Sequence, residues 1–232
     1  MAGVPWGVRD AVAVFGLYFV GSALAGYALA GAATAPTGLI VSSLLWIAIL
    51  VGWIRLRFGG HARELLGRAR PRSVEALIGL GAGIGIFVVV ILGFATLLGM
   101  LIQLTGNDVP VVQQEFRTFS ADPATAPLFA VGAVLLGPLA EELFFRGLLY
   151  PALRKRIRVW PAVAVSGLVF AFSHLQATPA GYGLVVAIIF PVGMLLAWLF
   201  EWRKSLLAPI VAHAAYNCIQ VGVLILAGEP PG

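Results

Sequence analysis

The chain alternates long apolar runs with short segments that carry most of its charged residues. A helix needs about 20 mainly apolar residues to cross the hydrocarbon core of a bilayer, and seven runs have about that length or more. The pattern therefore predicts an all-α fold, a polytopic membrane helical bundle with about seven transmembrane helices. The expected spans are residues 10–33, 36–54, 73–104, 128–152, 160–177, 181–200 and 205–227.

Two of these spans have unusual lengths, and the first has an alternative interpretation. Residues 73–104 exceed a simple crossing and residues 160–177 are short, so we expect tilt in one and partial burial by protein in the other. The Ala-Leu-Ala sequence at 28–30 imitates a signal-peptide cleavage site. No strongly basic segment precedes the first run, because Arg9 is followed by Asp10, and we therefore expect this span to be retained.

The composition narrows the class of protein. Of the 232 residues, 60% are hydrophobic and 11% are charged, and the mean hydropathy is +0.98. An ordinary soluble domain has about 45–50% apolar and about 25% charged residues. This composition excludes a soluble globular domain and an intrinsically disordered chain, and it makes the lipid bilayer the expected partner. Cys218 is the only cysteine, so no intrachain disulfide can form.

Basic residues gather in a few loops. Twelve of the fifteen Lys and Arg residues lie in residues 55–72, 153–160 and 203–204, which seven spans would place on one side of the membrane. The positive-inside rule then predicts a cytoplasmic N-terminus and an external C-terminus. The pI of 9.9 follows from this topology, and we expect no nucleic-acid partner.

A glycine-rich run at residues 79–85 superficially resembles a phosphate-binding loop. It lacks a preceding strand and the Lys-Ser/Thr pair of such loops. At helical spacing its glycines form two small-xxx-small pairs, which let another helix approach closely. The pairs are Gly79/Gly83 and Gly81/Gly85.

Five ionisable residues lie inside the predicted spans, away from the span ends. A charged side chain at mid-bilayer costs about 2.5–3.5 kcal/mol even on the lenient insertion scale. Counted from the basic loops at 1.5 Å per residue, these groups and Asn217 lie about 12 to 21 Å into the membrane. Three helices therefore bring polar groups to a similar depth, where one hydrated cavity can satisfy them all. The five are Glu141, Glu142, Arg146, His174 and His213.

These side chains favour hydrolytic chemistry. Glu142 and Arg146 are i and i+4 on a helix and can pair, although such a pair could serve only to fix helix register. That alternative leaves Glu141 unexplained, and a second carboxylate is a candidate general base. His213 and Asn217 are also i and i+4, face the same partner helix, and can both donate hydrogen bonds to a developing oxyanion.

A serine nucleophile is the other hydrolytic option. Ser173 precedes His174 in the sequence, but consecutive side chains on a helix point about 100° apart. The sequence also has no G-x-S-x-G motif. We therefore do not expect a serine hydrolase.

Three motifs, in this order, resemble those of the CAAX prenyl protease type II and bacteriocin-processing family, also called the Abi family. The motifs are Glu141-Glu142-x-x-x-Arg146, Phe170-x-x-x-His174 and His213-x-x-x-Asn217. The resemblance covers roughly residues 127–220, and the first three spans show none. We treat residues 1–232 as a single integral membrane domain. Its parts are the N-terminal spans and loop (1–126) and the catalytic core (127–220).

The resemblance implies an intramembrane endopeptidase. Glu141 would be the general base, with His174 assisting it, and His213 and Asn217 would form the oxyanion hole. No cofactor is expected, since the sequence has no H-E-x-x-H motif. The alternative is Zn²⁺ or another divalent metal bound by Glu141, His174 and His213. The residues that would position the base are Glu142 and Arg146.

The expected substrate is a hydrophobic peptide or the membrane-proximal end of another protein, and the motifs do not indicate whether it is lipidated. Arg outnumbers Lys by 13 to 2, which suggests a GC-rich bacterial genome and a bacterial cytoplasmic membrane. Two other classes stay open: a catalytically silent scaffold or immunity partner, and a proton-coupled transporter. Transporters often contain paired repeats with broken helices, which this sequence lacks, and the intact motifs favour an enzyme over a scaffold.

Overall fold

The computed structural model describes residues 3–28, 35–104, 124–174 and 182–227. The elements of these segments are helical, which confirms the predicted all-α fold. η1 is a 3₁₀ helix, and η2, η3 and η4 are π-helical turns inside longer helices. In chain order the elements are α1 (Val8–Ala28), α2 (Ala35–Phe58), η1 (Gly59–Leu66), α3 (Arg72–Ile86), η2 (Phe87–Ala95), α4 (Thr96–Leu104), α6 (Ala126–Ala130), η3 (Val131–Leu136), α7 (Gly137–Glu142), η4 (Leu143–Leu149), α8 (Tyr150–Arg154), α9 (Val159–Ser173), α10 (Tyr182–Arg203) and α11 (Leu207–Ala227).

Six helical segments among the described residues are long and apolar enough to cross a membrane, so the chain is a helical membrane bundle. The predicted fifth span corresponds to α9, which has only 15 residues; the end of that predicted span lies outside the described residues. α9 buries one face, and its main helical neighbour is α10. The six long segments are Val8–Ala28, Pro36–Leu66, Arg72–Leu104, Ala126–Arg154, Gly183–Arg203 and Leu207–Leu226.

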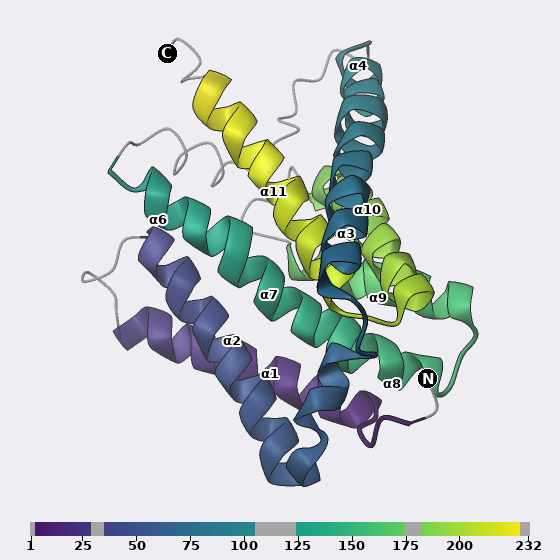
Figure 1. The fold of residues 1–232 in the computed structure, drawn as a ribbon. Helices are drawn as coiled ribbons and strands as arrows, with labels where there is room; N and C mark the ends of the chain where they lie inside the picture. Colours follow the sequence, from purple (N-terminus) through teal and green to yellow (C-terminus); the bar gives the residue numbers. More distant parts are fainter. Residues whose placement is uncertain (1–2, 29–34, 105–123, 175–181, 228–232) are drawn as a thin grey trace.

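The segment from α6 to α8 is the central helix of the bundle. It is the most deeply buried of the six long segments. In Figure 1 it runs as a teal helix between α2 and α11, and its turns contact α1 and α2 on one side and α9, α10 and α11 on the other. Polar residues on this helix can therefore meet partners from both halves of the chain.

α3 packs against α11 through a row of small residues. A Cβ added at Gly79 would lie 2.6 Å from the carbonyl oxygen of Ala208, and one at Gly83 would collide with the carbonyl oxygen of Ala212. This close approach confirms the first predicted glycine pair. The second pair, Gly81 and Gly85, has no atom within 4 Å of its added Cβ positions and was wrongly predicted as a contact. The two rows lie on different faces of α3, and only one faces α11.

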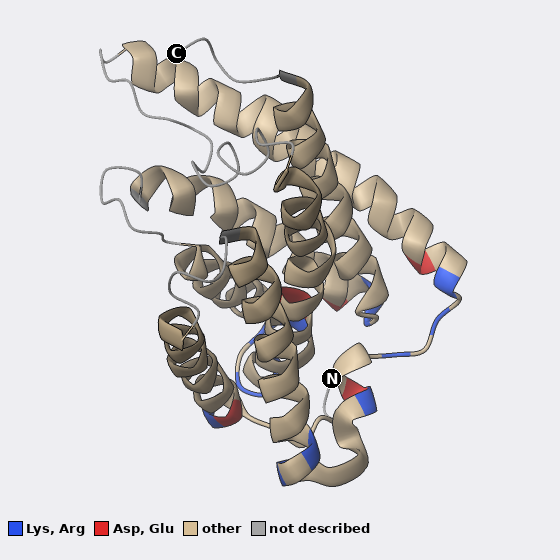
Figure 2. Cartoon of the chain, turned by 90° about the vertical axis from the view of Figure 1, so that its left-hand side faces the viewer, with Lys and Arg blue, Asp and Glu red and all other residues tan. Residues whose placement is uncertain are grey.

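The basic loops lie together at one end of the bundle. The Arg68 amide donates to the Lys204 carbonyl at 2.6 Å, and Arg203 Nη2 lies 2.5 Å from Oε1 of the buried Glu75. Lys155 Nζ donates to the Trp6 carbonyl at 2.7 Å, and the Trp6 ring lies 6.3 Å from that of Phe58, so the remaining basic loop lies at the same end. Figure 2 shows the blue segments near the N-terminus, while the helix ends near the C-terminus are tan. The common side expected for these loops is therefore present.

Candidate active site

Glu142 and Arg146 form a fully buried ion pair in the middle of the central helix. Arg146 Nη1 donates to Glu142 Oε1 at 2.7 Å, so the predicted i, i+4 contact is present. Arg146 also donates through Nη2 to the Gly193 carbonyl at 2.9 Å, and its guanidinium lies 4.7 Å from the centre of the Phe170 ring. A buried charge needs such partners, because desolvation costs several kcal/mol per ion. Arg146 thereby links the central helix to α10 and α9.

A glycine contact that the sequence analysis missed supports this link. Gly193 on α10 packs directly against Gly167 on α9: a Cβ added at Gly193 would lie 2.9 Å from the Gly167 Cα. The absence of both side chains lets the two backbones approach closely. Each glycine is isolated within an apolar run and lacks the dense glycine pattern that marks α3.

His213 lies between the two carboxylates. Its Nδ1 is 3.0 Å from Glu142 Oε1, and its Nε2 is 3.9 Å from Glu141 Oε2. The ring is buried, with 4% of the side chain exposed. Since the Glu142 carboxylate is paired with Arg146 and can only accept, Nδ1 carries the proton of this hydrogen bond. In the neutral ring Nε2 is then an acceptor, and it donates only when the ring is doubly protonated.

His174, just after the end of α9, approaches Glu141 from another direction. Its Nε2 lies 3.7 Å from Glu141 Oε2, and its Nδ1 lies 2.8 Å from the Phe170 carbonyl oxygen. A carbonyl only accepts, so Nδ1 is the donor and Nε2 of the neutral ring is free to accept. The Ser173 hydroxyl donates to the same carbonyl at 2.8 Å. Nδ1 of His174 therefore offers no lone pair with which to activate Ser173.

Glu141 differs from Glu142 in its exposure and in having no ion-pair partner within hydrogen-bond distance among the described residues. Its side chain is 21% exposed, whereas Glu142 is fully buried. Its Oε2 atom has no hydrogen-bond partner within the described part of the chain, and the Nε2 atoms of His174 and His213 both face it. The structure thus brings together five of the six predicted site residues, from the central helix, the end of α9 and α11.

Asn217, the sixth predicted site residue, binds a different part of the central helix. Its Nδ2 donates to the Ala133 carbonyl at 2.7 Å. The hydrogen bonds of η3 run from residue i to i−5, as between the Gly137 amide and the Gly132 carbonyl. The next donor in this register would be Pro138, which has no N–H, so Asn217 supplies the missing donor. His213 and Asn217 face the same helix, as expected, but they do not bind at the same point.

The donor atoms around Glu141 are the ones that a metal site would use. Each imidazole has its Nδ1 held by an acceptor and its Nε2 facing the carboxylate, an arrangement common for metal-bound histidines. As arranged, however, the described residues contain no group of three or more His, Cys, Asp or Glu side chains that could hold a metal ion. The zinc alternative at Glu141, His174 and His213 stays a prediction for experiment.

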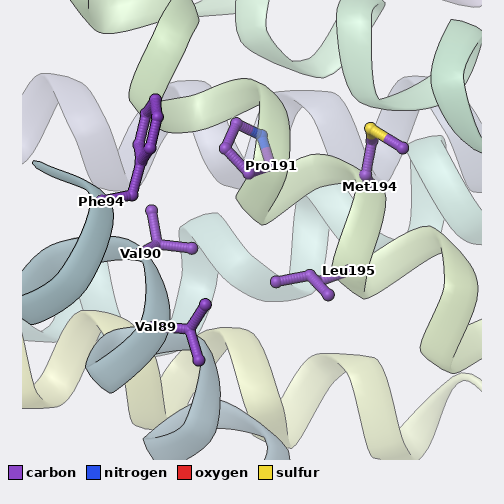
Figure 3. A pocket seen from close by; sticks show the side chains of 6 residues that line it. All are labelled: Val89, Val90, Phe94, Pro191, Met194 and Leu195. Atoms are coloured by element: carbon purple, nitrogen blue, oxygen red, sulfur yellow. The ribbon is translucent and has the colours of Figure 1, made fainter. Parts of the chain in front are cut away.

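A separate apolar pocket of about 380 Å³ lies between η2 and α10. Figure 3 shows that the side chains lining it come from these two helices and face one another. All of them are apolar, so these side chains offer no acid, base or nucleophile. They are Val89, Val90, Phe94, Pro191, Met194 and Leu195.

Comparison with known proteins identifies the same part of the chain as the motifs do. Residues 123–219 match the family described as type II CAAX prenyl endopeptidase, Rce1-like. The chain is 29% identical over 109 residues to the "Membrane-embedded CAAX protease MroQ" of Staphylococcus aureus. It is 26% identical over 104 residues to the "Putative membrane peptidase YdiL" of Bacillus subtilis. These matches confirm the resemblance that the three motifs indicated.

The matched segments are partial. They cover 44% and 45% of this chain and 42% and 39% of the two relatives, so the chain matches less than half of either relative. No solved structure shows significant similarity to the chain.

Proposed function

This chain carries an Rce1-like region of the type II CAAX prenyl endopeptidase family, and from that premise we propose that it is an intramembrane endopeptidase. The observation that carries the proposal is the arrangement around Glu141 Oε2, with the Nε2 atoms of His174 and His213 at 3.7 and 3.9 Å. These distances are too long for direct hydrogen bonds and suit a water held between the groups.

In this proposal Glu141 and His174 orient and activate the attacking water. One O–H of the water donates to Glu141 Oε2 and the other to His174 Nε2, which leaves an oxygen lone pair for the scissile carbonyl carbon. Glu141 takes a proton as the C–O bond forms, and the same proton passes to the leaving amine when the C–N bond breaks. Hydrolysis thus consumes one water and leaves the carboxylate regenerated.

Glu142 and Arg146 have positioning roles in this scheme. Their ion pair holds the central helix against α10, and Glu142 fixes the ring of His213 through Nδ1. The oxyanion hole is assigned to Asn217 and His213. Asn217 keeps a second N–H beyond the one bonded to Ala133, whereas His213 donates from Nε2 only in its doubly protonated form.

The proposal also includes the orientation of the chain in the membrane and the class of its substrate. The basic loops are assigned to the cytoplasm by the positive-inside rule, with the C-terminus outside. The site lies in the interior of the bundle, so the substrate is assigned as a hydrophobic peptide or the membrane-proximal segment of a membrane protein. CAAX-type processing of a prenylated C-terminus is one case to be tested.

A peptide-cleavage assay tests the proposal. The detergent-purified chain is incubated with internally quenched Leu- and Ala-rich peptides, of which one set is unmodified and another ends in prenylated cysteine. We expect cleavage by the wild type and none by Glu141→Gln or His174→Ala, both of which should purify as folded species. The matched control is Glu64→Gln, at an acidic residue whose Oε1 lies 3.8 Å from His61 Nε2 outside the bundle core. Full activity of Glu141→Gln would refute the mechanism.

A further inference from the structure

α1 and α2 lie outside the region that matches the protease family, which begins at residue 123. They nevertheless pack against the helix that carries Glu141: α2 contacts α7 and η3, and α1 contacts η4. Figure 1 shows α1 and α2 side by side along this face of the central helix. This face is therefore covered by residues that the family motifs do not include.

The contact between α1, α2 and the central helix is aromatic. Phe144 and Phe145 follow Glu141 by three and four residues on the central helix. The Trp46 ring lies 5.2 Å from that of Phe144 and 5.9 Å from that of Phe145. Tyr18 stacks on Trp46 with a centroid distance of 4.2 Å and an angle of 13°. An aromatic wall therefore stands beside Glu141.

Polar groups are embedded in this wall. The Tyr18 hydroxyl lies beside the hydroxyls of Ser22 and Ser42, and Tyr18 is close enough to Glu141 to interact with it electrostatically. Trp46 is 6% exposed, yet its Nε1 has no hydrogen-bond partner among the described residues. Buried indole N–H groups normally find an acceptor, because an unpaired one costs free energy. The wall therefore offers one N–H donor without a partner among the described residues, Trp46 Nε1, stacked beside the Tyr18 ring.

A peptide substrate needs such donors at this depth. Hydrolysis requires an extended segment at the scissile bond, and its backbone carbonyls lose the hydrogen bonds that a helix or water would provide. Each unsatisfied backbone group costs several kcal/mol inside a membrane. Aromatic faces that bind apolar side chains, together with N–H and O–H donors, match this substrate better than they match a lipid chain, which has no acceptor along its hydrocarbon.

We propose that Tyr18 and Trp46 form a substrate-binding subsite for the apolar peptide segment next to the scissile bond. Their rings bind an apolar side chain, while the Tyr18 hydroxyl and Trp46 Nε1 donate to backbone carbonyls. The inference rests on the proposed peptidase function. It assigns substrate binding to α1 and α2, whereas the groups that act on water come from the helices of the matched region.

Steady-state kinetics with the unmodified Leu- and Ala-rich peptides test the subsite. Tyr18→Phe and Trp46→Phe each remove one donor and keep an aromatic ring. The matched controls are Tyr27→Phe and Trp160→Phe, at side chains that are 87% and 64% exposed. We expect KM to rise roughly fivefold in each subsite variant, the effect of one lost hydrogen bond, with kcat and both controls unchanged. If one variant fails to fold, the other decides.

A binding measurement separates this inference from the proposed function. Fluorescein-labelled peptide is titrated into Glu141→Gln, with and without Tyr18→Phe, and anisotropy gives the affinity. Weaker binding in the double variant supports the subsite even if the wild type cleaves nothing. An unchanged KM and affinity, or no peptide binding at all, would overturn it. An effect confined to prenylated peptides would also overturn it, because the wall would then bind a lipid chain.

Discussion

Glu142 Oε1 lies 3.0 Å from Nδ1 of His213, 71 residues away in the sequence. The same oxygen is 2.7 Å from Arg146 Nη1, so a single carboxylate oxygen joins an arginine of its own helix to a histidine of α11. Glu142 is therefore committed to structure, whereas Glu141 has no ion-pair partner closer than 3.7 Å within the described residues. The two adjacent glutamates therefore have different roles, and substitutions of the residues around each should have different effects.

Removal of the Arg146 side chain should destabilise the protein strongly. Arg146→Ala leaves Glu142 charged and fully buried without its cation, and breaking a buried pair in this way costs about 3–5 kcal/mol. The free energy of unfolding in mixed detergent measures this loss. Arg156→Ala, at an exposed residue, is the control and should change stability by no more than about 0.5 kcal/mol. A stable and fully active Arg146→Ala would contradict the positioning role.

The sequence predicted the contacts that follow from helical periodicity. Glu142 and Arg146 share a helix, so their pairing required only a count of four residues, and the similar depth of Glu141, His174 and His213 followed from helix rise and topology. Contacts between helices were harder to predict. The partner of Asn217 depends on the π register of η3 and on the missing N–H of Pro138, and neither is visible in a hydropathy pattern.

The wall formed by Tyr18 and Trp46 was missed for a related reason. Aromatic residues in apolar spans are normally packing residues, and no charge marked these two as unusual. They lie near Glu141 because α1 and α2 pack on the central helix. The same limit applied to the glycines: Gly79 and Gly83 were correctly predicted to contact a helix, whereas the contact of Gly167 with Gly193 was not foreseen.

Asn217 should have a structural role that can be separated from catalysis. Asn217→Ala leaves the Ala133 carbonyl without its donor and should cost about 1–3 kcal/mol. Pro138→Ala in the same chain restores an N–H at position 138, which can bond to Ala133, and should recover most of that stability. If Asn217 also belongs to the oxyanion hole, the double variant will be stable but have a reduced kcat. Recovery of both properties would leave Asn217 with the structural role alone.

The packing of α3 on α11 should be sensitive to one added methyl group. Gly83→Ala places a Cβ against the Ala212 carbonyl, one residue before His213, and overpacking of this kind costs about 1–3 kcal/mol. We expect lower stability and lower activity, because α11 must shift. Gly81→Ala adds the same methyl group to the same helix where no atom lies within 4 Å. Thermal unfolding of the two variants should therefore differ, and equal melting temperatures would contradict the packing.

Reporter fusions should locate the ends of the helices. Fusions after residues 65, 156 and 204 should read cytoplasmic, because the basic loops lie together at one end of the bundle. Fusions near residue 115 and at the C-terminus should read external. A cytoplasmic C-terminus would mean that α9 does not complete a crossing, which its 15 residues would allow. The geometry around Glu141 would be unaffected by that result.

Metal dependence decides how His213 takes part in the reaction. If Glu141 and His174 activate water directly, EDTA or phenanthroline should leave cleavage intact, and elemental analysis should find much less than one metal per chain. If Zn²⁺ is held by Glu141, His174 and His213, chelation should abolish cleavage, added Zn²⁺ should restore it, and His213→Ala should lose the bound metal. One zinc per chain, whose removal abolishes activity and whose return restores it, would overturn the oxyanion role of His213. The Nε2 atom of His213 would then be a metal ligand. The contact of Nδ1 with Glu142 would fit either outcome, since it orients the ring in both. Peptide hydrolysis would remain the proposed reaction.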